Sequence, residues 1–227
     1  MSDREPVTIL LAPPGSRAEA VACELAGEMT DAARALGDEV ANRDGIGFSF
    51  ERARTLRDAW HATSPPVLWH PGFAASSRTD PLVIARRLRR LLPGARVAVL
   101  MDDPVETIAR VHALELGRAG RGPELERWVR ARTRVDHYHG RAPDWALRDA
   151  DPRPLAEASA RLFGAERLAL VRLEDPGRTP VPDWLGIGGP RFAEIVARSA
   201  RSGGAKSHVS EGVRRALEPY YAGLPGF

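Results

Sequence analysis

The sequence LLPGARVAVLMDDPVE, residues 91–106, is the most informative about the fold. Its middle part, residues 95–101, is almost entirely apolar, which is typical of a strand in a parallel sheet that helices cover on both faces. Two aspartates end this run. Asp103, with Pro104 directly after it and Glu106 three residues after it, predicts a capped helix that begins at this point. The stretch therefore predicts a strand that leads straight into a helix.

On both sides of this unit, short apolar runs alternate with segments whose apolar residues have helical spacing. We predict three more strands, over residues 7–12, 65–73 and 168–173, and helices over residues 16–29, 50–60, 81–92, 105–116, 155–163 and 210–221. Such alternation indicates an α/β fold with a mainly parallel central sheet flanked by helices. We expect a single domain over residues 1–227, with a polar insertion of helix and loop at about residues 117–154.

The charged residues are unusual in kind, because Lys206 is the only lysine among 33 basic residues. Thirty acidic residues are interspersed with them and aromatic residues make up only 6%, unlike the unopposed basic face and stacking aromatics of a nucleic-acid binder. We therefore attribute the arginine excess to a coding bias and expect no nucleic-acid partner. The lone Cys23 excludes an intramolecular disulfide. No signal peptide or membrane span is expected, so we predict a cytoplasmic protein.

Taken together, these segments resemble the sulfotransferase family that uses 3′-phosphoadenosine 5′-phosphosulfate (PAPS). Residues 91–106 are similar to the family's LLPGAR lead into a strand and its R-D-P-V-E-R terminus, and residues 161–175 to its F-G-x-E-R-L-L-V-L-x-Y-E-D-L segment. Residues 184–187 resemble its F-L-G-L and residues 217–221 its closing L-x-x-Y-Y. The resemblance runs in order from Val7 to about Leu224 and implies a P-loop-like sulfotransferase fold.

The same resemblance implies two PAPS-binding motifs, and this chain departs from both. The family's first loop is P-K-S-G-T-T, but here Pro14 takes the place of the lysine that contacts the sulfuryl group. The second motif is R-D-P-x-x-x-x-x-S, but here Asp102 takes the arginine position and Arg110 the serine position. An aspartate in contact with a phosphate is repelled by about 1–4 kcal/mol. We therefore expect no cofactor, with PAPS only if the chain is a true sulfotransferase.

The candidate site lies where ligands bind in open parallel sheets, at the carboxyl ends of the strands. Gly15, Ser16 and Arg17 are predicted to bind a sulfate, because N–H groups at a helix N-terminus and an arginine both attract anions. Asp102 is predicted to be catalytic, since a carboxylate there can hold an ammonium group or accept a proton, and the other interpretation is a solvated loop. His70 is the second catalytic candidate, and packing is its alternative.

Three more residues complete the predicted substrate site. Arg110 can restore part of the lost positive charge, and Lys206 lies in a glycine-bearing basic segment that is either a loop over the ligand or a linker. His112 lies on the helix after Asp102 and faces either the cleft or solvent. No metal site is expected, because the histidine pair around Tyr138 has no cysteine partners.

These observations favour an enzyme of small-molecule, natural-product metabolism that acts on an already sulfated, amine-bearing substrate. The internal amine would displace the sulfate, for example by closing an aziridine ring, a step that needs mainly orientation and leaving-group stabilisation. One alternative is a PAPS-dependent sulfotransferase that modifies a hydroxyl or amine. Another is a non-catalytic subunit of a heteromeric enzyme. The expected partners are thus a small-molecule substrate and another subunit, which is either a second copy of this chain or a different protein. No interaction with a membrane is expected.

Overall fold

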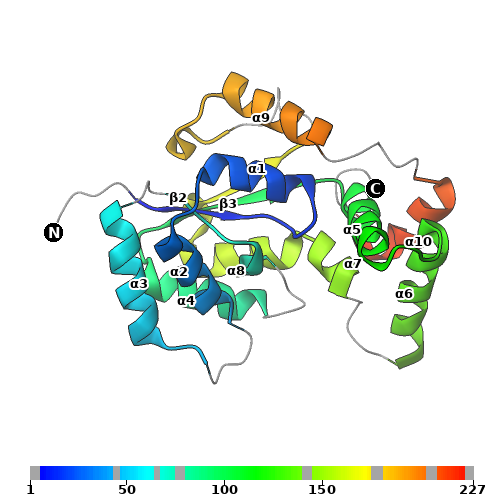
Figure 1. Cartoon of the computed structure of the whole chain (residues 1–227), viewed down its shortest axis with the longest axis horizontal. Helices are drawn as coiled ribbons and strands as arrows, with labels where there is room; N and C mark the ends of the chain where they lie inside the picture. The colour runs from blue at the N-terminus through cyan, green and yellow to red at the C-terminus, as the bar shows by residue number, and fades with distance from the viewer. Residues whose placement is uncertain are drawn as a thin grey trace.

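The computed structural model describes residues 6–42, 47–63, 67–74, 80–139, 145–174, 181–202 and 209–222. Its sheet has four strands, all paired in parallel, in the order β2-β1-β3-β4 (Figure 1). These strands are β1 (Thr8–Leu11), β2 (Val67–Trp69), β3 (Arg96–Met101) and β4 (Leu168–Arg172). The central strands β1 and β3 are almost wholly buried, whereas the edge strand β4 exposes nearly half of Leu170. The predicted α/β fold with a parallel sheet is confirmed.

Helices cover both faces of the sheet (Figure 1). One face packs against α1 (Arg17–Ala26) and α9 (Gly189–Ser202), and the other against α2 (Asp31–Ala41), α3 (Phe50–Thr63), α4 (Pro81–Leu91) and α8 (Arg153–Phe163). Successive side chains of a strand point to opposite faces. Leu10 therefore packs in the core under α1 and α9, and Ile9 and Leu11 pack in the core on the other face of the sheet. The central strands β1 and β3 are therefore apolar because both of their faces are covered.

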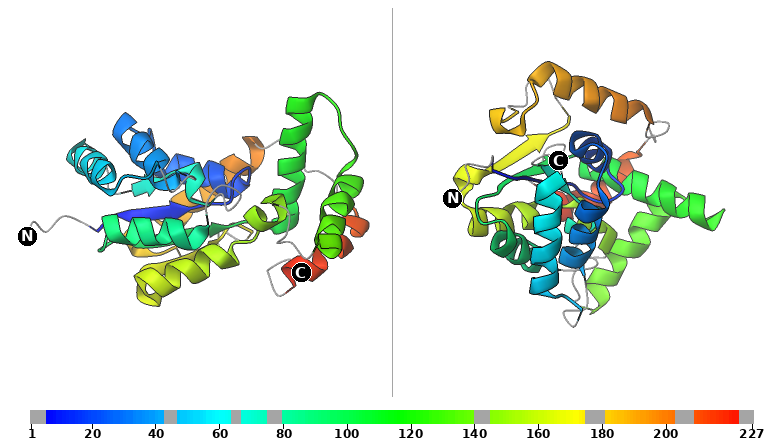
Figure 2. Two further views of the ribbon diagram at one scale, coloured as in Figure 1. Left: turned by 90° about the horizontal axis from the view of Figure 1, so that it is seen from below. Right: turned by 60° about the vertical axis from the view of Figure 1, so that its left-hand side comes forward.

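A separate group of helices stands at the end of the sheet where β3 passes into α5 (Figure 2). Its members are α5 (Pro104–Ala119), α6 (Leu125–His139), α7 (Trp145–Ala150) and α10 (Glu211–Tyr221). They share a third apolar core, and the buried hydroxyl of Tyr221 donates to the carbonyl of Leu147 at 2.7 Å. The predicted polar insertion contributes α6 and α7, and the C-terminal helix α10 completes the group. The group therefore faces the candidate site.

Several element boundaries differ from the predictions. The helix expected over residues 16–29 ends at Gly27, whose φ of 68° suits glycine, and α2 begins after Thr30, which accepts from the N–H of Ala33 at 3.2 Å. The strand expected over residues 65–73 is limited to β2, because the prolines favour a 3-10 turn, η1 (Pro71–Phe73). Two more 3-10 turns are η2 (Ala165–Arg167) and η3 (Asp183–Leu185), and α9 was not predicted.

Candidate functional site

Asp102 and Arg17 meet at the carboxyl ends of the strands, although they are 85 residues apart in sequence. Asp102 directly follows β3, and Arg17 is the first residue of α1. One Asp102 carboxylate oxygen accepts from the Arg17 guanidinium at 2.8 Å, and the other accepts from the Arg17 backbone N–H at 3.1 Å. The Asp102 side chain is fully buried, while that of Arg17 is 14% exposed. The carboxylate therefore closes the N-terminus of α1.

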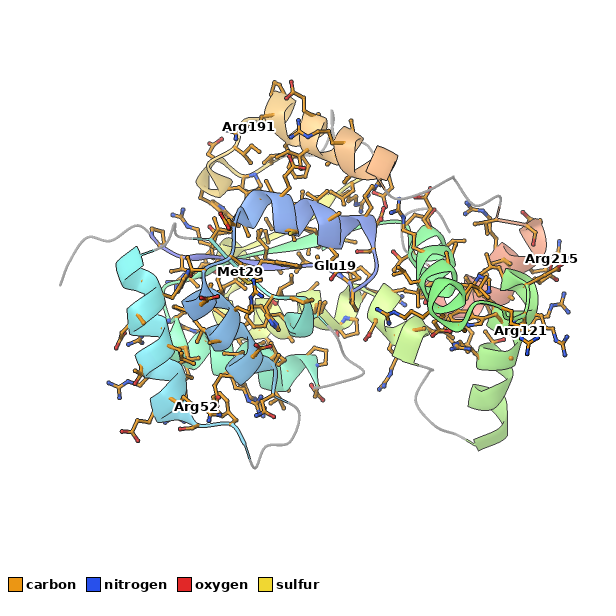
Figure 3. All side chains as sticks on the ribbon, in the orientation of Figure 1. Glu19, Met29, Arg52, Arg121, Arg191 and Arg215 are labelled. Atoms are coloured by element: carbon orange, nitrogen blue, oxygen red, sulfur yellow. The ribbon has the colours of Figure 1, made fainter. Side chains whose placement is uncertain are left out.

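In the loop between β1 and α1, a second carboxylate of the chain accepts a hydrogen bond from a backbone N–H group. Gly15 has a φ of 74°, which suits glycine, and its N–H donates to a Glu19 carboxylate oxygen at 2.6 Å. Ser16 caps α1 by accepting from the N–H of Glu19 at 3.1 Å, and its hydroxyl donates to the Pro13 carbonyl. Glu19 lies on the first turn of α1 (Figure 3). The capping-box spacing of Ser16 and Glu19 is thus present, but Glu19 binds the N–H of Gly15.

The structure brings Gly15, Ser16, Arg17 and Asp102 together, as the strand-end argument predicts. The N–H groups of Gly15 and Arg17 each bind a carboxylate, which is favourable at the positive end of a helix. These two carboxylates lie where an external anion would have to bind. The prediction that this loop binds a sulfate therefore stays a prediction. To bind there, a sulfate has to compete with the carboxylates of Glu19 and Asp102 for these N–H groups.

Glu174 is a further acidic residue at this edge, which the sequence argument missed. It lies two residues after the end of β4. The N–H of Leu173, just before it, donates to the Met101 carbonyl at 2.9 Å, so the pairing of the two chains continues beyond the last residue of β4. Partial burial of the carboxyl group, followed by the negative charge of Asp102, raises the pKa of Glu174 above its ordinary value. Its signal in the sequence is its position directly after the fourth predicted strand, residues 168–173.

Asp103 connects this edge to the C-terminal helix. Its carboxylate accepts from the N–H of Val105 at 2.7 Å, which confirms the predicted cap of α5. The guanidinium of Arg214, on α10, lies 3.9 Å from the other Asp103 oxygen. A cation from near the end of the sequence is therefore placed beside the aspartates that follow β3.

An apolar wall lies beside the loop. A Cβ atom built on Gly15 would lie 3.1 Å from the side chain of Val111 and 3.4 Å from that of Leu114, both on α5. Leu114 is 50% exposed, which is unusual for a large apolar side chain on these helices. The hydrocarbon part of a small molecule has an apolar surface to contact next to the charged residues.

His70 lies elsewhere along the same edge, after β2. Its Nδ1 accepts from the N–H of Gly72 at 3.1 Å, so its Nε2 carries the proton that faces Asp38 at 3.2 Å. Strand β1 separates β2 from β3, which places His70 about 10 Å from the end of β3. Both ring nitrogens are engaged in local contacts, and a proton-accepting role for His70 stays a prediction.

The remaining predicted substrate residues do not join the Asp102–Arg17 pair. The Nε2 of His112 donates to the carbonyl of Pro123 at 2.8 Å, and its ring packs edge-on against Trp128 in the helical group. Arg110 is half-buried on α5 and forms no ion pair with any residue that the structure describes. Lys206 lies outside the described residues.

Comparison with known proteins is informative about the fold. No protein-family model matches this chain, and no curated protein does. The crystal structure of a sulfotransferase from Alicyclobacillus acidocaldarius superposes with a TM-score of 0.52 at 14% identity, over 95% of each chain. The chain has a sulfotransferase fold. This confirms the fold that the sequence motifs implied, over nearly the whole length of the chain.

A sulfotransferase fold implies PAPS as a co-substrate, and the residues at this edge do not fit it. The N–H groups that would meet its phosphate and sulfate oxygens hold the carboxylates of Glu19 and Asp102. A dianion placed on these N–H groups would have to displace both carboxylates, and the Glu19 carboxylate, which has no cation beside it in the contacts described above, would repel it by about 1–4 kcal/mol at contact. Among the described residues, no three His, Cys, Asp or Glu side chains converge to hold a metal ion, and no helix has the length and apolarity to cross a membrane.

Proposed function

We propose that this protein is an enzyme of small-molecule metabolism that uses a sulfotransferase fold on a substrate carrying both a sulfate ester and an amine. The observation that carries the proposal is the buried Asp102 carboxylate on the N–H and guanidinium of Arg17. In this ion pair, a carboxylate of the chain itself takes the donors of Arg17 that could otherwise attract a PAPS phosphate. Anionic and cationic groups that lie side by side suit a zwitterionic amino sulfate better than a nucleotide.

The proposed reaction is an intramolecular displacement. The amine nitrogen uses its lone pair to form a bond to the carbon that carries the sulfate, and the carbon–oxygen bond breaks, so that sulfate leaves with the bonding electrons. When amine and sulfate are on neighbouring carbons, the product is an aziridine. The nitrogen must be unprotonated when it attacks, so an ammonium substrate first gives one proton to a carboxylate of the enzyme.

Arg17 is the group we assign to the leaving sulfate. A guanidinium has five N–H donors, and Asp102 accepts from one of them. The Arg17 side chain is 14% exposed, so a ligand can reach donors that Asp102 does not use. Positive charge fixed beside the breaking bond stabilises the developing sulfate dianion, and the fixed site keeps the amine close to the reacting carbon.

The test measures sulfate release by the purified protein. Vicinal amino sulfates, beginning with 2-aminoethyl hydrogen sulfate, are incubated with the protein, and free sulfate is measured by ion chromatography and the cyclic amine by mass spectrometry. In parallel, labelled PAPS is supplied with the unsulfated amino alcohols. We expect sulfate release in the first reaction and no label transfer in the second. Label transfer would show a PAPS-dependent sulfotransferase, and inactivity in both reactions would favour a non-catalytic subunit.

A further inference from the structure

We infer that Glu174 is the catalytic residue that accepts the proton from the substrate amine, and that Asp102 is a positioning residue for Arg17. The inference rests on the proposed function and names the base that this reaction requires. It departs from the sequence prediction, in which Asp102 was the carboxylate candidate for that role.

Asp102 is badly placed to exchange a proton with a substrate. Its side chain is fully buried, and each of its two oxygens accepts a hydrogen bond from Arg17. Protonation of Asp102 would break the ion pair and leave the Arg17 guanidinium without its partner, which is costly in a buried site. Its fixed position instead sets the direction of the Arg17 guanidinium.

Glu174 has the accessibility that Asp102 lacks. It is solvent-exposed as a residue, and its carboxylate forms no ion pair with the described residues. The hydrogen bond from Leu173 to Met101 continues the pairing of β4 with β3, so Glu174 emerges beside the two aspartates. A substrate that contacts Arg17 at this edge therefore has a free carboxylate within the same cluster.

The charged groups around Glu174 come from three elements. Asp102 and Asp103 follow β3, Arg17 begins α1, and Arg214 of α10 lies beside Asp103. Partial burial and the charges of Asp102 and Asp103 raise the pKa of Glu174, which Arg17 counteracts in part. A raised pKa makes a carboxylate a better proton acceptor.

The proton balance of the step is simple. The substrate ammonium transfers one proton to the ionised Glu174 carboxylate, and the neutral amine then attacks the carbon that carries sulfate. The product leaves as a protonated cyclic amine together with the sulfate dianion. Glu174 then gives its proton to water, which restores the enzyme.

The experiment compares sulfate release from the same amino sulfates by the wild-type protein, Glu174→Gln, Glu174→Asp, Asp102→Asn and the control Glu166→Gln. Glu166 lies just before the opposite end of β4, with a side chain that is 73% exposed. We expect Glu174→Gln to lower kcat about 10²- to 10⁴-fold with little change in KM. Glu174→Asp is expected to recover part of kcat, and Glu166→Gln to behave as wild type.

The pH profile separates the two carboxylates. In Asp102→Asn, removal of a neighbouring negative charge lowers the pKa of Glu174, so the acid limb of kcat/KM moves to lower pH while turnover persists. Wild-type kcat in Glu174→Gln, or turnover lost only in Asp102→Asn with the fold intact, would overturn the inference. If Asp102→Asn does not fold, Glu174→Gln alone decides. Absence of sulfate release by the wild-type protein would instead overturn the proposed function, and with it the assignment of Glu174.

Discussion

The two oxygens of the Asp102 carboxylate bind two donors of one residue, the backbone N–H and the guanidinium of Arg17. This contact joins the end of β3 to the start of α1. It pairs Asp102 with the arginine at the start of α1 and places a negative charge at the positive end of that helix. The N-terminus of α1 is therefore occupied by a carboxylate of the chain itself.

The ion pair has a measurable effect on stability. Replacement of Asp102 by Ala leaves the Arg17 guanidinium and N–H without a partner, so we expect the free energy of unfolding to fall by about 3 kcal/mol. Equilibrium unfolding in urea measures this loss. Asp58→Ala is the control, because Asp58 is 64% exposed and its ion pair with Arg57 is worth less than about 1 kcal/mol. Equal losses in both variants would contradict the structural account of the pair.

The loop is expected to gain affinity for anions when its carboxylate is removed. In Asp102→Ser, the backbone N–H of Arg17 and the guanidinium donor that Asp102 holds both become available, so millimolar inorganic phosphate should raise the melting temperature of this variant more than that of the wild type. At a hundred times the Kd, the stabilisation is about 2.7 kcal/mol. Adding Arg17→Gln to the variant should abolish the effect. An equal phosphate response in the wild type would show that Asp102 does not block the loop.

Glu174 gives the stability a pH dependence of known sign. A carboxyl group whose pKa is raised by folding stabilises the folded state at low pH, and this contribution is lost as the pH rises through the raised pKa. We therefore expect Glu174→Gln to have a slightly higher melting temperature than wild type at pH 7. The gain in free energy of unfolding is less than about 0.5 kcal/mol because the residue is solvent-exposed. Below about pH 4 we expect the two proteins to have the same melting temperature. Thermal melts at both pH values measure this difference. A lower melting temperature of Glu174→Gln at pH 7 would contradict the expected effect of a raised Glu174 pKa.

Arg17 is expected to be needed for sulfate release. Removal of one donor that stabilises a developing negative charge lowers kcat about 10²- to 10³-fold, so we expect that loss in Arg17→Gln. Arg17→Lys keeps the charge without the planar fork and should lie between this variant and wild type. Arg54→Gln, on the exposed surface of α3, is the matched control. Full turnover in a folded Arg17→Gln protein would remove Arg17 from the mechanism.

The sequence predicted the elements of this site better than their contacts. The apolar run that ends at Asp102 and the cap formed by Asp103 follow from short-range spacing, and both are present. Glu19 shows the limit of this reasoning, because its spacing from Ser16 indicates a capping box, yet its carboxylate binds the N–H of Gly15. Which of two nearby donors a side chain takes depends on the turn of the loop, which the spacing alone does not fix.

The parallel strands, most of the helices between them and the sulfotransferase-type fold were predictable from the sequence, and the structure confirms them. These features depend on residues that are neighbours in the chain. The tertiary structure alone decided that Arg17 faces Asp102, that Glu174 joins them and that His70 lies apart. The reason is the strand order β2-β1-β3-β4, which places the ends of β1, β3 and β4 together and β2 on the far side of β1. Apolar residues dominate all four strands, including the partly exposed edge strand β4, so the apolar pattern does not encode which strands are neighbours.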